Sequence, residues 1–425
     1  MLRQAGKTGW EQELSDNLVM RPVRDEHDAE RFVGLSEVVN HQGADCERLI
    51  HHHPACARDH FIIVEDTRTG EVVSTTCIIP WRARMGGIDL NVAQLEMAVT
   101  HPDYRHRGLI RAQINRYHRL LAEQQYDLSL IEGIPYYYRR FGYAYALDHR
   151  CDASLPVTCI PDEWEAELLR LRPAQPEDAA LLTHLFERET ERLDLHVLRT
   201  AEYWRYILAH MELGVWVVEA GESRSEAVGY LVTDPLVAAD GSRRGTCVDE
   251  SSVADQADAL AVLRWLKRQG GSEIRVTWPR MGDLAAVARD LGSQPISRYQ
   301  WLVRIVDIRR FLRKIGPVLE RRLALSDLAG YSADLVLNLY EEAFRLRFSG
   351  GRLLAVEPAG FIDYSMGADG GDLCIPVEAF VRLLVGYRDL DQLFDAWPDI
   401  VVKEDARQAL EVLFPKLASD LQILY

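Results

Sequence analysis

The sequence of 425 residues predicts an α+β protein made of three units. The first observation is a run of elements typical of α+β domains: a helix, a hairpin, a buried strand, a basic loop and a second helix. The second is an echo of this run roughly 150 residues later, where "RPVRDEHDA" from Arg21 returns as "RPAQPEDA" from Arg172. The third is a C-terminal stretch, beginning near Trp301, that combines strand-like runs with amphipathic helices.

The elements of the first unit follow from local patterns. Asp28 can cap a helix whose apolar positions Phe32, Leu35 and Val39 lie at helical spacing. The stretch "HFIIVEDTRTGEVVSTTCIIP" has two strand-forming runs on either side of a Thr-Gly pair, which predicts a hairpin. The apolar run "VAQLEMAV" then predicts a buried strand, and the basic loop follows it directly.

The second and third units show similar patterns. The second repeats the order of elements, which indicates a duplication, but an acidic stretch, "VDESSVADQADAL", stands where the basic loop should fall. In the third, two strand-like runs surround a Gly-Gly pair, and "CIPVEAFVRLLVGY" and "EDARQALEVLF" have the apolar spacing of amphipathic helices. Because no low-complexity linker separates the units, we expect them to pack together, over residues 1–155, 156–300 and 301–425.

Charge and composition restrict the function classes. The chain has 49 basic and 65 acidic side chains, a net charge of −16, which argues against a general binder of nucleic acid or anionic membranes and favours cationic small partners. Seven scattered cysteines, an odd number without paired spacing, indicate reduced thiols. The first residues lack the apolar core of a signal peptide, and no apolar run is long enough to span a bilayer. We therefore expect a cytoplasmic protein.

The stretch "HPDYRHRGLIRAQI", residues 101–114, gathers Arg105, Arg107 and Arg111 around Gly108 at the start of a helix. Three interpretations compete: a solvated helix start, a nucleic-acid patch that mixes arginine with tyrosine, and an anion-binding site. The third has a physical basis, because backbone N–H groups at a helix N-terminus are unpaired and the helix dipole is positive there. Glycine lets a phosphate approach closely, and arginine supplies paired donors.

The helix after the loop favours the anion-binding site. Ile110, Ile114, Tyr117 and Leu121 lie at spacings of four, three and four, so one face of the helix is buried. Its N-terminus is then fixed at the end of the strand "LEMAV", where a bound anion would meet a rigid frame. A helix that binds nucleic acid would more usually present a free face, and the net charge of −16 also argues against that class.

On these residues the chain resembles a known family. Strand, Arg-x-x-Gly and helix are similar to the pyrophosphate loop of the GCN5-related N-acetyltransferases, the GNAT superfamily, and "GIPYYYRRFGYAYAL" resembles a second signature of that superfamily. Many members carry Gly or Ala two positions after the motif glycine, whereas this chain has Ile110. The loop is similar in form to the enhanced intracellular survival (Eis) branch. The resemblance implies two tandem GNAT-like α/β domains, the second degenerate, and a third domain that resembles sterol carrier proteins.

The resemblance also implies that acetyl-CoA is the co-substrate. By analogy, the backbone of the strand pairs with the pantetheine arm like an added strand, the loop holds the diphosphate, and the glycine that opens the second signature belongs to the same site. The cofactor-binding residues expected in this way are Met97, Ala98, Val99, Arg105, His106, Arg107, Gly108, Leu109, Ile110 and Gly133.

Acetyl transfer to an amine needs an acid for the leaving thiolate and a base for the amine. Alignment on the segment Arg-Phe-Gly-Tyr places the general acid of the Eis branch on Tyr138. For the base, the resemblance points to the terminal carboxylate of the chain, which here belongs to Tyr425. Glu96 is the alternative, since Gln94, Glu96 and Ala98 share one face of a strand and many GNAT enzymes place a glutamate near this point.

The cluster "CERLIHHHPACARDH" raises the question of a metal site. Three consecutive histidines cannot all face one ion on a regular element, and no second ligand pair has zinc spacing, so we expect no metal. We expect this segment to line or cover the acceptor cleft, where its histidines would sense pH.

Two function classes follow from these observations. The first is an acetyl-CoA-dependent N-acetyltransferase that acts on a primary amine, with an aminoglycoside, a polyamine or a lysine-like acceptor, and that by analogy with the Eis branch forms a homohexamer. The second is a non-catalytic scaffold that binds acyl-CoA or a lipid. The complete Arg-x-x-Gly loop and Tyr138 favour the enzyme, because a protein without catalysis would be free to lose them.

Overall fold

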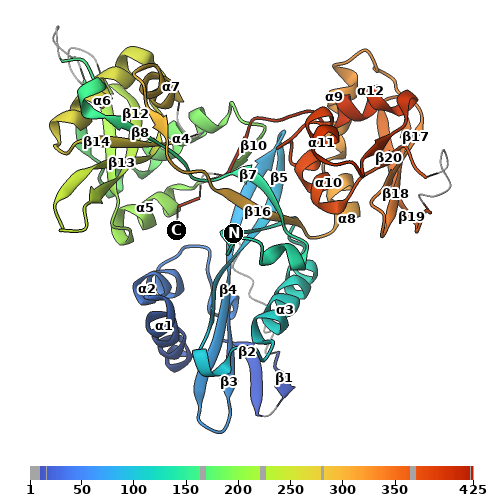
Figure 1. Cartoon of the computed structure of the whole chain (residues 1–425), viewed down its shortest axis with the longest axis horizontal. Helices are drawn as coiled ribbons and strands as arrows, with labels where there is room; N and C mark the ends of the chain where they lie inside the picture. Colours follow the sequence, from blue (N-terminus) through green and yellow to red (C-terminus); the bar gives the residue numbers. More distant parts are fainter. Residues whose placement is uncertain are drawn as a thin grey trace.

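The computed structural model has three lobes, each built around one β-sheet (Figure 1). The predicted α+β fold is confirmed, since helices pack on the sheet of every lobe. Among the described residues, no helix combines the length and the apolar character needed to cross a membrane. The structure describes residues 10–15, 17–162, 169–220, 226–278, 282–363, 370–421, 423 and 424.

The first sheet forms the lower lobe in Figure 1, with two helices on one face and one on the other. Along the path from β1 to β7, neighbouring strands are antiparallel except for the central pair β5 and β6, which are parallel. Across the sheet the strands are β1 (Gln12–Ser15), β2 (Leu18–Pro22), β3 (Phe61–Asp66), β4 (Glu71–Met85), β5 (Ile88–Thr100), β6 (Leu128–Ile131), β16 (Gln300–Ile305) and β7 (Ala144–Asp148). Its helices are α1 (Glu26–Asn40) and α2 (Gly43–His51) on one face and α3 (Leu109–Glu123) on the other, with short 3₁₀ turns η1 (Arg58–His60), η2 (Pro102–Tyr104) and η3 (Tyr138–Phe141).

The second sheet repeats this pattern, again with one parallel pair, β13 and β14. Across the sheet the strands are β9 (Arg170–Pro173), β11 (Gly214–Ala220), β12 (Glu226–Val237), β13 (Arg243–Ser251), β14 (Glu273–Trp278), β8 (Cys151–Pro156) and β15 (Gln294–Pro295). Its helices are α4 (Ala179–Thr190), α5 (Ala201–His210), α6 (Gln256–Arg268) and α7 (Gly282–Asp290), with 3₁₀ turns η4 (Val157–Cys159) and η5 (Pro176–Asp178).

The third sheet is smaller and lies in the orange and red lobe of Figure 1. The two strand-like runs predicted around the Gly-Gly pair are confirmed as β18 and β19, and the two predicted helices as α10 and α12. Its strands are β19 (Arg352–Gly360), β18 (Ala343–Ser349), β17 (Asp334–Asn338), β20 (Leu373–Cys374) and β21 (Val401–Val402), and its helices are α8 (Ile308–Lys314), α9 (Gly316–Ala324), α10 (Val377–Leu384), α11 (Leu390–Ala396) and α12 (Glu404–Leu413).

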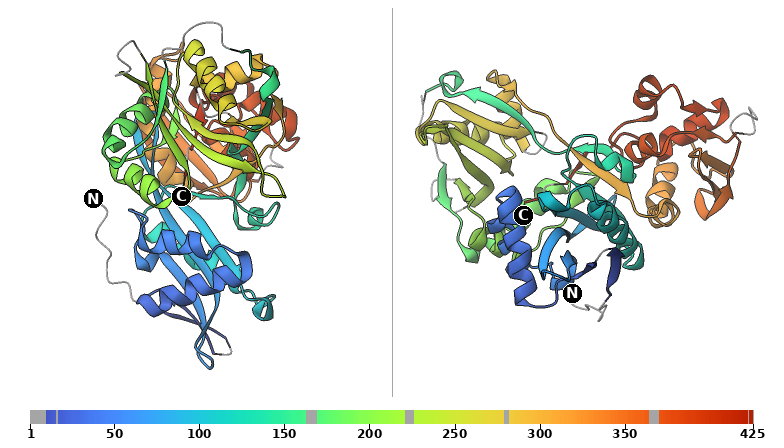
Figure 2. Two further views of the ribbon diagram at one scale, coloured as in Figure 1. Left: turned by 90° about the vertical axis from the view of Figure 1, so that its left-hand side faces the viewer. Right: turned by 60° about the horizontal axis from the view of Figure 1, so that its bottom comes forward.

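The first two sheets exchange strands. β8 follows β7 in the sequence, yet it pairs with β14 and β15 of the second sheet. β16 follows β15, yet it lies between β6 and β7 of the first sheet. Figure 2 shows the crossing, with β16 in orange between the lobes. The domain boundaries predicted at 155/156 and 300/301 stay predictions, and each falls within one of the exchanged strands.

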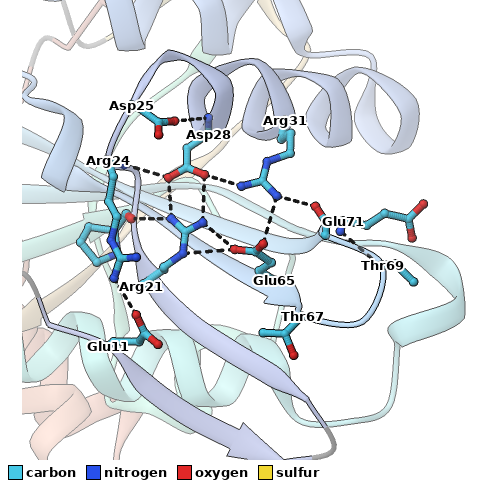
Figure 3. A network of polar contacts seen from close by, with 12 residues as sticks. Glu11, Arg21, Arg24, Asp25, Asp28, Arg31, Glu65, Thr67, Thr69 and Glu71 are labelled. Carbon is cyan, nitrogen blue, oxygen red and sulfur yellow. Dashed lines mark hydrogen bonds and ion pairs between the residues drawn. The ribbon is translucent and has the colours of Figure 1, made fainter.

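The first helix begins three residues earlier than the sequence predicts. Asp25, not Asp28, is the N-cap, and its side chain accepts a hydrogen bond of 2.9 Å from the Asp28 backbone N–H. Asp28 is instead drawn into a buried ion pair with Arg21, in which Arg21 Nη2 donates to Asp28 Oδ1 over 2.9 Å (Figure 3). Arg21 also donates to Glu65 on β3, so one guanidinium ties the helix to two strands.

The second unit contains the same arrangement, which supports the predicted duplication. Arg172 Nη2 donates to Asp178 Oδ1 over 2.9 Å, and its Nε donates to Glu219 on β11 over 2.7 Å. The carboxylate of Asp178 also accepts from the Gln175 backbone N–H, as Asp28 accepts from that of Arg24. The faint echo in the sequence is therefore a repeated contact between the helix and two strands.

The end of the chain returns to the first sheet. β22 (Ser419–Asp420) pairs in parallel with β10 (Leu195–Val197), and β10 pairs with the Ala83–Met85 end of β4. The Asp194 backbone N–H donates to Ala418 O over 2.7 Å and extends this pairing. The strand β10, which belongs to the second unit in sequence, therefore holds the C-terminal strand β22 against β4 of the first unit.

Candidate active site

The strands β5 and β6 separate after a short parallel contact. Their pairing covers only Val92–Gln94 of β5, and in the described part of the chain no strand pairs with β5 on that side beyond Gln94. A bulge follows, where Met97 takes a left-handed conformation with φ of 51°. Thr75 Oγ1 on β4 donates to Met97 O over 3.0 Å and fixes the bulge. The outer edge of β5 is left open for a ligand that can pair as a strand does.

The basic loop lies at the end of this open edge and leads into α3. Gly108 is the N-cap of α3 and has φ of 76°, a conformation that glycine adopts without strain and that leaves the space beside it open. It has no side chain to cap the helix, so the first backbone N–H groups of α3 are available to an anion. The buried face predicted for the helix is confirmed at Ile114, Tyr117 and Leu121, while Ile110 is half-buried.

Neighbouring contacts hold the loop in place. The Tyr104 hydroxyl donates to the buried Asp66 carboxylate at the end of β3 over 2.9 Å. The guanidinium of Arg107 stacks 4.6 Å from the centre of the Tyr104 ring and donates to Asp103 O. Arg107 thus braces the loop, while the loop residues on either side of it line a cavity.

That cavity has a volume of about 680 Å³ and runs from the loop to the turn η3. Met97, Arg107 and Gly133, which the sequence assigned to the cofactor, do not line it. The predicted site residues that do are Ala98, Val99, Arg105, His106, Gly108, Leu109, Ile110 and Tyr138. The lining residues that the sequence did not assign to the cofactor or to catalysis are Val39, Asn40, Thr100, Tyr104, Arg111, Ile134, Tyr137 and Arg140.

The missed residues differ in how well the sequence could have shown them. Tyr104, Arg111, Tyr137 and Arg140 lie inside the two quoted motifs, so a wider reading of those motifs would have included them. The end of α1 at Asn40 could not be placed, since it reaches the cavity only through helix packing. A second cavity, of about 350 Å³ between α7 and strand β8, contains none of the predicted residues.

Tyr138 has the environment of a group that keeps its proton. Its side chain is buried, with 5% of the residue exposed, and its ring lies on Gly133, where a Cβ atom would come within 2.1 Å of Tyr138 Cδ2. Burial raises the pKa of Tyr138 above its ordinary value, and the negative charge of Glu96 raises it further. Gly133 is therefore needed for the ring of Tyr138. The packing of this ring explains why residue 133 is glycine, and the sequence did not reveal it.

Glu96 is held by a short chain of hydrogen bonds. Trp81 Nε1 donates to Gln94 Oε1 over 2.9 Å, and Gln94 Nε2 donates to Glu96 Oε1 over 3.0 Å. An indole N–H can only donate, so it fixes the orientation of the buried Gln94 amide. Glu96 is half-buried, and its negative charge helps to raise the pKa of Tyr138.

Tyr425, predicted as the source of the base, lies outside the described residues. The residues before it are buried: Leu421 is 1% exposed, Ile423 4% and Leu424 8%. They belong to the same apolar cluster as Trp81 of the first unit and Tyr203 of the second. The tail therefore enters the protein interior between the units, as its apolar composition indicates.

The histidine segment packs against α5 of the second unit. The ring of His53 lies between Trp81, Tyr203 and Tyr206, at 5.2–5.5 Å between ring centres, and His52 stacks on His210 at 3.9 Å. Burial lowers the pKa of His53 to about 3, so His53 is neutral near pH 7 and does not sense pH in that range. Within the described ranges, no three His, Cys, Asp or Glu side chains are arranged to hold a metal ion.

Comparisons with known proteins agree with this geometry. Residues 20–146 match the family model described as an acetyltransferase (GNAT) domain. No curated protein sequence matches the chain.

Solved structures share the fold over almost the whole chain. A GCN5-related N-acetyltransferase from Anabaena variabilis is 16% identical with a TM-score of 0.72, covering 96% of this chain and 100% of its own. Eis1 from Mycobacterium abscessus is 16% identical with a TM-score of 0.66 and the same coverage. The N-myristoyltransferase of Saccharomyces cerevisiae with bound myristoyl-CoA is 12% identical with a TM-score of 0.51, covering 70% of this chain and 85% of its own.

Proposed function

Because residues 20–146 form a GNAT acetyltransferase domain, we propose that this protein transfers the acetyl group of acetyl-CoA to a primary amine. The observation that carries the proposal is that one cavity joins the N-terminus of α3 to Tyr138. One end offers the amides and arginines that bind a diphosphate, and the other offers a protonated phenol.

Acetyl-CoA fits the residues that are present. Its diphosphate would lie at Gly108–Ile110, where helix N–H groups are available and Arg105 and Arg111 supply positive charge. Its pantetheine arm would pair with the open edge of β5 at Ala98 and Val99. Met97 would contribute by shaping the bulge, and Arg107 by bracing the loop.

The chemistry is direct attack. The neutral amine nitrogen bonds to the thioester carbonyl carbon, and the carbon–sulfur bond then breaks. The Tyr138 hydroxyl gives its proton to the leaving thiolate and regains one from solvent. The proton lost by the amine goes to the terminal carboxylate of Tyr425, with Glu96 as the alternative acceptor. The buried approach of the tail between the units supports the first choice, and the negative charge of Glu96, which raises the pKa of Tyr138, supports the second.

The acceptor class follows from charge. A net charge of −16 favours a cationic amine, so aminoglycosides, polyamines and lysine side chains are the acceptors to test. The same proposal includes the Eis-like assignments: a third unit that resembles sterol carrier proteins, units bounded at 155/156 and 300/301, a cytoplasmic location and a hexamer. The second candidate function is a scaffold that binds acyl-CoA or lipid. Such a scaffold does not need the buried phenol of Tyr138 beside the cavity, so this side chain favours the enzyme.

A screen of amines tests the proposed function. The purified protein is incubated with acetyl-CoA and each amine class, and the free thiol of CoA is measured. Thiol release that depends on one class identifies the acceptor. Binding of acetyl-CoA, seen as a raised melting temperature, without thiol release from any amine would favour the scaffold.

A further inference from the structure

We propose that Arg139 and Glu378 are positioning residues for Tyr138, so that the third unit holds the turn that carries the acid. This inference rests on the proposed acetyl transfer, because it concerns the same tyrosine. It assigns a role to the third unit that does not depend on any ligand of that unit.

The turn η3 sends consecutive side chains in different directions. In a 3₁₀ helix neighbouring side chains are about 120° apart. Tyr138 and Arg140 line the cavity, whereas Arg139 reaches the helix α10 of the third unit. Arg139 Nε donates to Glu378 Oε1 over 3.2 Å, and Arg139 Nη2 donates to Glu378 Oε2 over 2.7 Å. Two parallel hydrogen bonds fix the plane of the Arg139 guanidinium as well as its distance from the Glu378 carboxylate.

The helix α10 is itself anchored beside the turn. Arg382 Nε, one helical turn after Glu378, donates to Tyr145 O on β7 over 2.8 Å. The Tyr387 hydroxyl donates to Asp148 Oδ1 at the end of β7 over 3.0 Å. Figure 1 shows α10 on the side of the third lobe that faces β7. Glu378 therefore extends from a support that is fixed to the first sheet.

The turn has few regular contacts of its own. It has left-handed residues on either side, Tyr136 with φ of 70° and Gly142 with φ of 79°. Its backbone bonds are long, such as 3.3 Å from Arg140 N–H to Tyr137 O. Ile134 and Tyr136 are exposed, at 68% and 74%. The ring of Tyr138 is packed, but a backbone with these features gains a more fixed geometry from a contact outside the turn, and the bidentate pair supplies one.

A positioning role and a purely structural role predict different results. The side chains of Arg139 and Glu378 are 35% and 30% exposed, and pairs of this kind contribute little to overall stability. A structural role would therefore leave both melting temperature and turnover nearly unchanged. A positioning role lowers turnover, since a misplacement of about 1 Å at a reacting group can cost up to about 10²-fold in rate.

The test compares Glu378→Gln, Arg139→Glu, and the double variant in which Arg139→Glu is combined with Glu378→Arg. Each single change should lower kcat about tenfold and leave the KM for acetyl-CoA unchanged. The double variant, which restores a pair of reversed sign, should recover most of the loss. Arg407→Gln is the matched control, because the side chain of Arg407 is exposed to a similar degree as that of Arg139 and pairs with two carboxylates elsewhere in the third unit, those of Asp391 and Glu411. It should leave kcat at the wild-type value.

The same changes are then made in a Tyr138→Phe background. If the pair acts through Tyr138, Glu378→Gln lowers kcat no further in the Tyr138→Phe background. An equal loss in both backgrounds, or a wild-type kcat for Glu378→Gln, overturns the inference. If no amine is acetylated by the wild-type protein, the proposed function fails separately. In that case the rate of amide hydrogen exchange over residues 134–142 tests the positioning role. Glu378→Gln should raise this rate, and an unchanged rate overturns the positioning role.

Discussion

At the scale of single residues, the proposed chemistry depends on Tyr138. We expect Tyr138→Phe to lower kcat roughly 10²–10⁴-fold, because the change removes the hydroxyl that protonates the thiolate and keeps the ring that packs on Gly133. Tyr136→Phe is the control, since Tyr136 is exposed and lines no part of the cavity. Thiol release at saturating acetyl-CoA measures both. Equal rates for the two variants would remove Tyr138 from the acid role.

The choice of base is also decided by single changes. Extending the chain by a few residues after Tyr425 should cost roughly 10²–10⁴-fold in turnover and leave acetyl-CoA binding nearly unchanged, because a positioned base is lost. Glu96→Gln should cost little by comparison. The measurements are kcat and the shift of melting temperature with acetyl-CoA. If the extended protein turns over normally and Glu96→Gln does not, Glu96 is the base.

Asp28 links acidity to the stability of the first unit. The Arg21 guanidinium and neighbouring donors more than offset the effect of burial and hold the pKa of Asp28 well below its ordinary value. Its stabilising contribution is therefore present above the unfolded pKa of about 3.9 and is lost as the pH falls below it. Asp28→Asn should cost about 2 kcal/mol at pH 7.

The comparison of the two proteins across pH tests this linkage. The difference in melting temperature between the wild type and Asp28→Asn should shrink from pH 6 to pH 3. Asp178→Asn, at the equivalent position of the second unit, should behave in the same direction, because the Arg172 guanidinium also lowers the pKa of Asp178. A difference that stays constant over this range would contradict the assignment.

At the scale of elements, the two copies differ in what lies at the start of one helix. In the first copy, Gly108 leaves the N-terminus of α3 open. In the second, the carboxylate of Asp255 accepts from the N–H groups of Ala257 and Asp258 over 2.8 and 3.1 Å, and so occupies the N-terminus of α6 with its own negative charge. A diphosphate would be repelled there.

We therefore expect one acetyl-CoA per chain, bound by the first unit. Titration calorimetry should give a stoichiometry of one. Gly108→Glu should abolish this binding, because it adds a Cβ at a left-handed position and a negative charge where the diphosphate lies. The melting temperature without ligand should fall only slightly, since the space beside Gly108 is open. Two equivalent sites per chain would contradict the argument from Asp255.

At the scale of the whole molecule, strand exchange makes the lobes interdependent. β8 and β16 each belong to a sheet other than the one built by the residues before them, and β22 joins the tail to β10. The rigid surface that results is suited to assembly, and we expect a homohexamer by analogy with the Eis branch. Light scattering at micromolar concentration should give six times the chain mass of 48.4 kDa, and a monomer mass would contradict this.

The sequence by itself determined the local features of this protein. The hairpin at Gly70, the buried face of α3 and the repeated Arg21 and Arg172 motifs are each set by residues close together in the chain, where period and turn chemistry are informative. A local error, Asp28 for Asp25 as the helix cap, arose because two acidic residues three apart compete and the ion pair with Arg21 selects between them.

Only the tertiary structure decided how distant parts meet. The exchange of β8 and β16, the route of the tail along β10 and the contact of Arg139 with Glu378 join residues up to 239 positions apart. Strand partners and ion-pair partners at such distances leave no periodic signal, because each depends on backbone pairing and packing contributed by several elements at once. The assignment of Gly133 to the cofactor stays a prediction, whereas its contact with the ring of Tyr138 came from the tertiary structure alone, for the same reason.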